Sequence, residues 1–100
     1  QETSVSVSHY AKRSSMPDFQ VKLLHRLVSY FKPDSILELG TNLGKSLAAM
    51  ASANPESKAV GVEGNASIAQ FANKNLKELG LVNAKVECDT FDTFLEKNQN

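Results

Sequence analysis

The segment SILELGTNLGKS, residues 35–46, joins a short apolar run to two glycines and the start of a helix. The apolar run over residues 35–39 predicts a strand buried on both faces. Residues 45–53 are rich in Ala, Leu and Met and stop before Asn54-Pro55, which predicts a helix slim enough to lie close on a sheet. A buried strand, a glycine turn and a helix form the opening unit of a parallel α/β sheet.

Two more strands and two more helices follow this unit. Residues 58–63 and 84–88 predict the second and third strands, Asn65 can cap the helix between them, and Gly80 closes that helix. A last helix begins at Phe91. This alternation predicts right-handed crossovers and a doubly wound parallel sheet with strand order 3-2-1.

The chain before residue 35 divides into two parts. Residues 1–15 are polar and are expected to form an arm, whereas residues 16–100 are expected to form the N-terminal part of the α/β domain. Ser15-Met-Pro-Asp18 is typical of a helix start, because Ser15 can cap free backbone N–H groups, Pro17 is tolerated in the first turn, and Asp18 suits the positive end of the helix. An extra N-terminal helix is predicted from there to Pro33, because apolar residues recur at helical spacing, namely Val21, Leu24, Leu27, Val28 and Phe31.

The two outer strands of this sheet differ in polarity. The third strand alternates apolar residues with Lys85 and Glu87, as an edge strand does, but the first strand is mostly apolar although it would form the opposite edge. We therefore expect the chain to be the N-terminal half of a larger sheet, with a fourth strand beyond residue 100. An unpaired first strand also predicts a homodimer of the isolated chain.

Composition excludes several classes of protein. One hundred residues permit one domain, and the balance of 11 basic and 11 acidic side chains gives no reason to expect nucleic acid or an anionic membrane as partner. Cys88 is the only cysteine, so the sequence offers no disulfide and no metal-ligand cluster. With no apolar run near the roughly 18 residues of a membrane span and no signal peptide, we expect a cytoplasmic protein.

The loop after the first strand is where open α/β sheets bind their ligands. A nucleotide phosphate loop ends, like this one, in Gly44-Lys45-Ser46, but it requires a glycine at position 39, where Leu39 stands. A dinucleotide fingerprint starting at Gly40 requires glycines at positions 42 and 45, which are Asn and Lys. Both motifs are out of register.

A third pattern, an acid two residues before the first glycine and another glycine four residues after it, matches Glu38, Gly40 and Gly44. With these residues the chain resembles the class I S-adenosylmethionine (SAM)-dependent methyltransferases of Rossmann-like fold, whose first motif usually reads E/D-x-G-x-G-x-G. Asn42 replaces the middle glycine, and Asn tolerates positive φ better than other side chains. The wider loop resembles the O-methyltransferases of the catechol and caffeoyl-CoA type.

The resemblance implies a role for each residue around the loop. Gly40, Asn42 and Gly44 would admit the methionine portion of SAM, Glu38 would attract its ammonium, and Thr41 and Ser46 would bind its carboxylate. Glu63, followed by Gly64 and Asn65, would accept the ribose hydroxyls, although dinucleotide-binding proteins share an acid there. Asp89 would accept the adenine amine beside Thr90, with Asp92 as a substitute and Phe91 as a ring contact.

The resemblance implies SAM-dependent methyl transfer to the oxygen of a small molecule, with this chain as the donor-binding half. A divalent metal or a general base would activate the acceptor from residues beyond this chain, so no catalytic residue and no metal ligand is assigned here. Two alternatives stay open: an NAD-type dinucleotide-binding domain, and a module that binds SAM without chemistry.

Overall fold

A computed structural model describes residues 17–41 and 43–98 of the chain. Asn42 lies outside these residues, as does the polar arm that is predicted over residues 1–15. The sheet consists of β1 (Ser35–Leu39), β2 (Lys58–Glu63) and β3 (Ala84–Cys88), all parallel, in the spatial order β1-β2-β3. The predicted order 3-2-1 is therefore confirmed.

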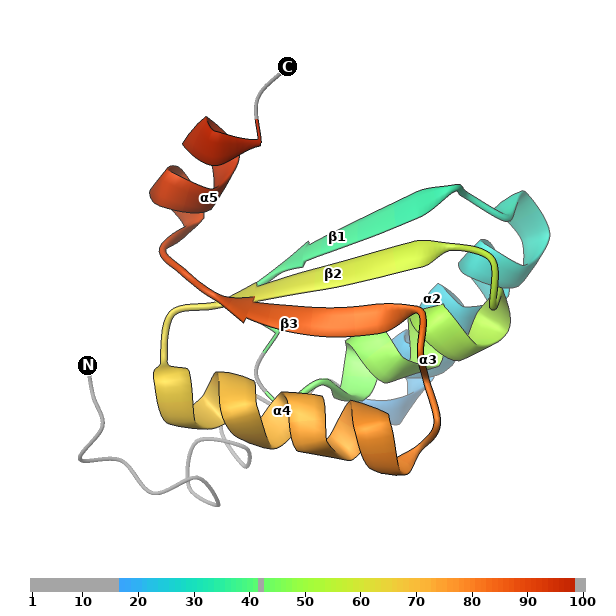
Figure 1. The fold of residues 1–100 in the computed structure, drawn as a ribbon. Helices are drawn as coiled ribbons and strands as arrows, with labels where there is room; N and C mark the ends of the chain where they lie inside the picture. The colour runs from blue at the N-terminus through green and yellow to red at the C-terminus, as the bar shows by residue number, and fades with distance from the viewer. Residues whose placement is uncertain (1–16, 42, 99–100) are drawn as a thin grey trace.

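The helices form layers on both sides of the sheet (Figure 1). α3 (Lys45–Ala53) and α4 (Ala66–Glu78) cover one face, and α2 (Asp18–Phe31) packs against α3. α5 (Phe91–Lys97) lies on the opposite side of the sheet. Among the residues that the structure describes, no helix has the length and apolarity needed to cross a bilayer.

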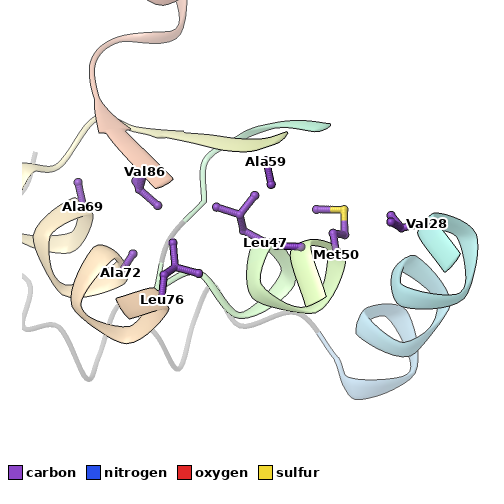
Figure 2. Packing of buried hydrophobic residues seen from close by; sticks show 9 residues of the cluster. Val28, Leu47, Met50, Ala59, Ala69, Ala72, Leu76 and Val86 are labelled. Carbon is purple, nitrogen blue, oxygen red and sulfur yellow. The ribbon is translucent and has the colours of Figure 1, made fainter. Parts of the chain in front are cut away.

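The main core lies between the sheet and the α3–α4 layer (Figure 2). Leu47 of α3 and Ala72 of α4 are fully buried, and small side chains let both helices approach the strands closely. In Figure 2, Leu76 of α4 and Val86 of β3 point toward each other, while Val28 of α2 points toward Met50 of α3. The apolar spacing of these helices predicts their buried sides.

Most element ends lie where the sequence predicts them. The side chain of Asn65 caps α4 by accepting a hydrogen bond from the backbone N–H of Ile68 (3.1 Å), and Gly80 follows α4 with φ of 73°. Pro17, expected in the first turn of α2, instead occupies its N-cap position, where no side chain caps the helix. The expected cap residue, Ser15, lies outside the described residues.

The two edges of the sheet differ in how their backbone groups are covered. At β3, the side-chain amide of Asn73 donates to the carbonyl of Val86 and accepts from its N–H, both at 2.8 Å, and so pairs with this strand as a neighbouring strand would. On β1, Leu37 and Leu39 are 49% and 43% exposed. The prediction that both faces of this strand are buried is therefore wrong within the described residues.

α2 carries more apolar surface than α3 covers. Its inward side includes Val28, which is buried, but five large side chains along the helix stay exposed: Phe19, Leu23, Leu27, Tyr30 and Phe31. Their spacing of three and four residues places them on one wide strip of the helix. Among the described residues, this strip of α2 has no covering element.

Candidate functional site

The turn between β1 and α3 brings the backbone back over β2. Gly40 and Gly44 have φ values of 76° and 88°, a left-handed conformation that glycine adopts without a steric penalty. The N–H of Gly40 donates to the carbonyl of Val62 (2.8 Å), and that of Gly44 donates to the carbonyl of Thr41 (3.1 Å). The predicted glycine bend is therefore present, directly behind Glu38.

Thr41 lies beneath this turn and is only 2% exposed. Its hydroxyl donates to the carbonyl of Glu38 (3.4 Å), and its side chain packs on Gly61 of β2. A Cβ added at Gly61 would lie 1.9 Å from Thr41 Oγ1 and 2.8 Å from its Cβ and Cγ2. Gly61, which no sequence motif marks, thus leaves the space in which Thr41 and the turn pack against the sheet.

Glu38 points from β1 toward the start of α3, where the Ser46 hydroxyl donates to its Oε2. Its other oxygen, Oε1, is buried and has no hydrogen-bond partner among the described residues. Burial raises the pKa of the Glu38 carboxyl, and the hydrogen bond from Ser46 partly offsets this rise. Glu38 is therefore a desolvated carboxyl group with one oxygen still available for a donor.

Glu63 ends β2 and is only 5% exposed. Its Oε2 accepts a hydrogen bond from the backbone N–H of Asn65 (3.2 Å). Asn65 uses its own side chain as the helix cap, which leaves its ligand role to be tested. Gly64, between them, is exposed, and a Cβ there would meet only the carbonyl of Asp89 at 3.8 Å.

Asp89 follows β3, and its N–H donates to the carbonyl of Glu63 (3.2 Å). Its Oδ1 accepts from the N–H of Thr90 (2.8 Å), and the Nζ of Lys97 lies 2.8 Å from Oδ2. The bond to Lys97 is the main cause that holds the pKa of the Asp89 carboxyl below its usual value. Thr90 caps α5 through its side chain, which accepts from Thr93 N–H (3.1 Å).

The strand register brings the three acids to one edge of the sheet. Glu38 pairs with Gly61, and Glu63 lies two residues further along β2 on the same face. Adjacent strands and a two-residue step separate the Cα atoms of Glu38 and Glu63 by about 8 Å. Glu63 pairs with Cys88, so Asp89 follows at the same edge. The three acids therefore lie near one another at the carboxyl ends of the strands.

Two side chains of α5, Phe91 and Lys97, also contact this edge of the sheet. The ring of Phe91 lies 3.6 Å from the position that a Cβ on Gly40 would take, so α5 packs against the glycine turn. Lys97 reaches Asp89 from the last turn of α5. Nothing in the sequence pattern marks Lys97, because an ion pair across a helix and a strand end has no fixed spacing. The described residues hold no group of three His, Cys, Asp or Glu side chains fit for a metal ion.

Three solved structures resemble the chain closely. A "putative O-methyltransferase" from Klebsiella pneumoniae is 26% identical, with a TM-score of 0.83 over 96% of this chain and 46% of its own. An O-methyltransferase from Bacillus cereus in complex with SAH is 25% identical, with a TM-score of 0.79 over 83% and 39%. The O-methyltransferase TomG from Streptomyces achromogenes, in complex with SAM, is 26% identical, with a TM-score of 0.78 over 100% and 48%.

The chain spans less than half the length of these three structures. Its three parallel strands and flanking helices match half of a Rossmann-like methyltransferase fold. No curated protein matches the chain. The family described as "putative methyltransferase" matches residues 32–99, which include the strands and the glycine turn. The chain therefore belongs to this methyltransferase family.

Proposed function

We propose that the chain is the donor-binding part of a SAM-dependent methyltransferase that acts on oxygen. One observation carries the proposal: Glu38 presents a buried carboxylate oxygen without a hydrogen-bond partner among the described residues, directly before the glycine turn. Leaving such an oxygen unpaired is unfavourable by about 1–3 kcal/mol or more, because it has lost its water. A ligand with an ammonium group, such as the methionine portion of SAM, removes this penalty.

The other polar groups at this edge fit the remaining parts of SAM. Gly40 and Gly44 offer backbone without side chains, Glu63 can accept the hydroxyls of the ribose, and Asp89 can accept the amine of adenine. The bound sulfonium would supply an activated methyl group. The residues of this chain would hold and orient SAM, because they include hydrogen-bond acceptors for both its methionine portion and its adenosine portion.

We further propose that the methyl acceptor is a small molecule. The O-methyltransferases among the similar structures support oxygen as the accepting atom. Activation of the acceptor, by a divalent metal or a general base, is assigned to residues outside this chain. The balanced charge gives no support for nucleic acid as a substrate, and the single cysteine favours the cytoplasm.

Calorimetric titration of the full-length protein with S-adenosylhomocysteine (SAH) and, separately, with NAD tests this proposal. We expect SAH to bind and NAD not to bind. Glu38→Gln should weaken SAH binding about 10- to 100-fold, since a hydrogen bond to a charged group contributes about 1.5–3 kcal/mol. Glu56→Gln removes an exposed acid from the loop before β2 and should leave the affinity unchanged. Selective NAD binding would overturn the proposal.

A further inference from the structure

Lys97 covers the carboxylate that is assigned to the adenine base. Its Nζ lies 2.8 Å from Asp89 Oδ2, and that oxygen is inaccessible to solvent. The other oxygen, Oδ1, already accepts the N–H of Thr90. The Asp89 side chain is 14% exposed, whereas the Lys97 side chain is 60% exposed. A ligand therefore cannot reach Oδ2 until the ammonium group moves away.

The backbone of α5 is held by contacts that do not involve the Lys97 side chain. Thr90 caps the helix, Phe91 packs against the turn at Gly40, and Phe94 is buried. These contacts hold the helix backbone against the rest of the domain. The Lys97 side chain, which is mostly exposed, can swing into solvent without any change in the helix.

We propose that Lys97 is a specificity-determining residue that competes with the amine of the adenine base for Asp89. The inference rests on the proposed function, because it concerns the base-binding end of the same site. In the unliganded chain Lys97 neutralises a mostly buried carboxylate whose Oδ1 already accepts the N–H of Thr90. Binding of a ligand that donates to Oδ2 displaces Lys97, so part of the binding energy is offset by the loss of the ion pair.

This competition depends on the group at position 6 of the purine. Adenine presents an amine, a donor, which must take the place of the Lys97 ammonium group. Hypoxanthine presents a carbonyl, an acceptor, which can bind the ammonium group while Lys97 stays close to Asp89. Removal of the ammonium group should therefore favour the adenine ligand and not its 6-oxo counterpart.

The experiment compares Lys97→Met with Lys85→Met in the full-length protein, using SAH and S-inosylhomocysteine as titrants. Lys85 is a matched control, since it is 65% exposed and pairs with Glu87 (3.2 Å) on the strand that leads to Asp89. Because Lys97 is mostly exposed, its ion pair contributes little, so we expect Lys97→Met to tighten SAH binding by about 1.4- to 5-fold. S-inosylhomocysteine should bind Lys97→Met no more tightly than wild type, and Lys85→Met should change neither affinity.

Two further measurements separate competition from a general effect of charge. In an Asp89→Asn background, Lys97→Met should have no effect on SAH affinity, because the partner of the ammonium group is gone. The difference in SAH affinity between wild type and Lys97→Met should become smaller as the salt concentration is raised. Equal or weaker SAH binding by Lys97→Met would overturn the inference while leaving the proposed function intact. Loss of SAH binding in every protein, wild type included, would overturn both.

Discussion

Replacement of Gly61 by alanine tests how tightly the glycine turn is seated on β2. The new methyl group would lie 1.9 Å from Thr41 Oγ1 and 2.8 Å from two of its carbon atoms, and Thr41 is 2% exposed. Thr41 therefore cannot rotate away without moving the turn. Overpacking of this kind costs about 1–3 kcal/mol, and three contacts below 3.0 Å place Gly61→Ala near the upper end.

A loss of about 3 kcal/mol corresponds to a fall in Tm of about 10 to 25 °C for a domain of this size. Urea denaturation followed by circular dichroism measures it. Gly64→Ala is the matched control, since its nearest neighbour would be 3.8 Å away, and it shares the entropic effect of the substitution on the unfolded chain. Thr41→Ala should restore part of the stability in the double variant. A Gly61→Ala protein as stable as Gly64→Ala would refute the packing argument.

Three further results are expected. Glu38→Gln should stabilise the unliganded protein at neutral pH. Burial raises the pKa of Glu38 above its reference value of 4.5, so the wild-type protein loses stability as the pH rises from about 4.5 through the raised pKa. The difference in Tm between Glu38→Gln and wild type should therefore grow from pH 4 to pH 8. Gly44→Ala should cost about 1–2 kcal/mol in urea denaturation, because its φ is 88°, and an unchanged midpoint would contradict the assigned turn. The 100-residue chain should self-associate through the edge of β1, and Leu37→Lys should reduce this in sedimentation whereas Val82→Lys, at a 98% exposed position, should not.

The sequence predicts the elements well because its local signals agree with one another. The strands at residues 35–39, 58–63 and 84–88 and the helix at residues 45–53 have the predicted bounds. Apolar periodicity, glycines and an Asn cap all mark the same boundaries, and short βαβ connections leave few possible topologies. The prediction that β1 is buried on both faces is wrong within the described residues, because burial depends on which elements cover a strand.

The site could be predicted only in part, because spacing along the chain locates strand ends but not side-chain partners. The positions of Glu38 and Glu63 at one edge follow from the parallel strands. The packing of Thr41 on Gly61 and the hydrogen bond from Ser46 to Glu38 depend on the rotation of the turn, which no motif specifies. The pairing of Asp89 with Lys97 depends on how α5 crosses the sheet.

The central claim is that one adenosyl ligand lies across the carboxyl ends of the three strands. Amide chemical-shift mapping by NMR, with SAH titrated into isotopically labelled full-length protein, tests it most directly. We expect the largest shifts at Gly40, Gly44, Gly64 and Thr90, and none at Ser57 or Asn83 near the opposite ends of the strands. Shifts confined to that opposite end, or saturation with SAH that leaves the glycine turn unperturbed, would contradict it.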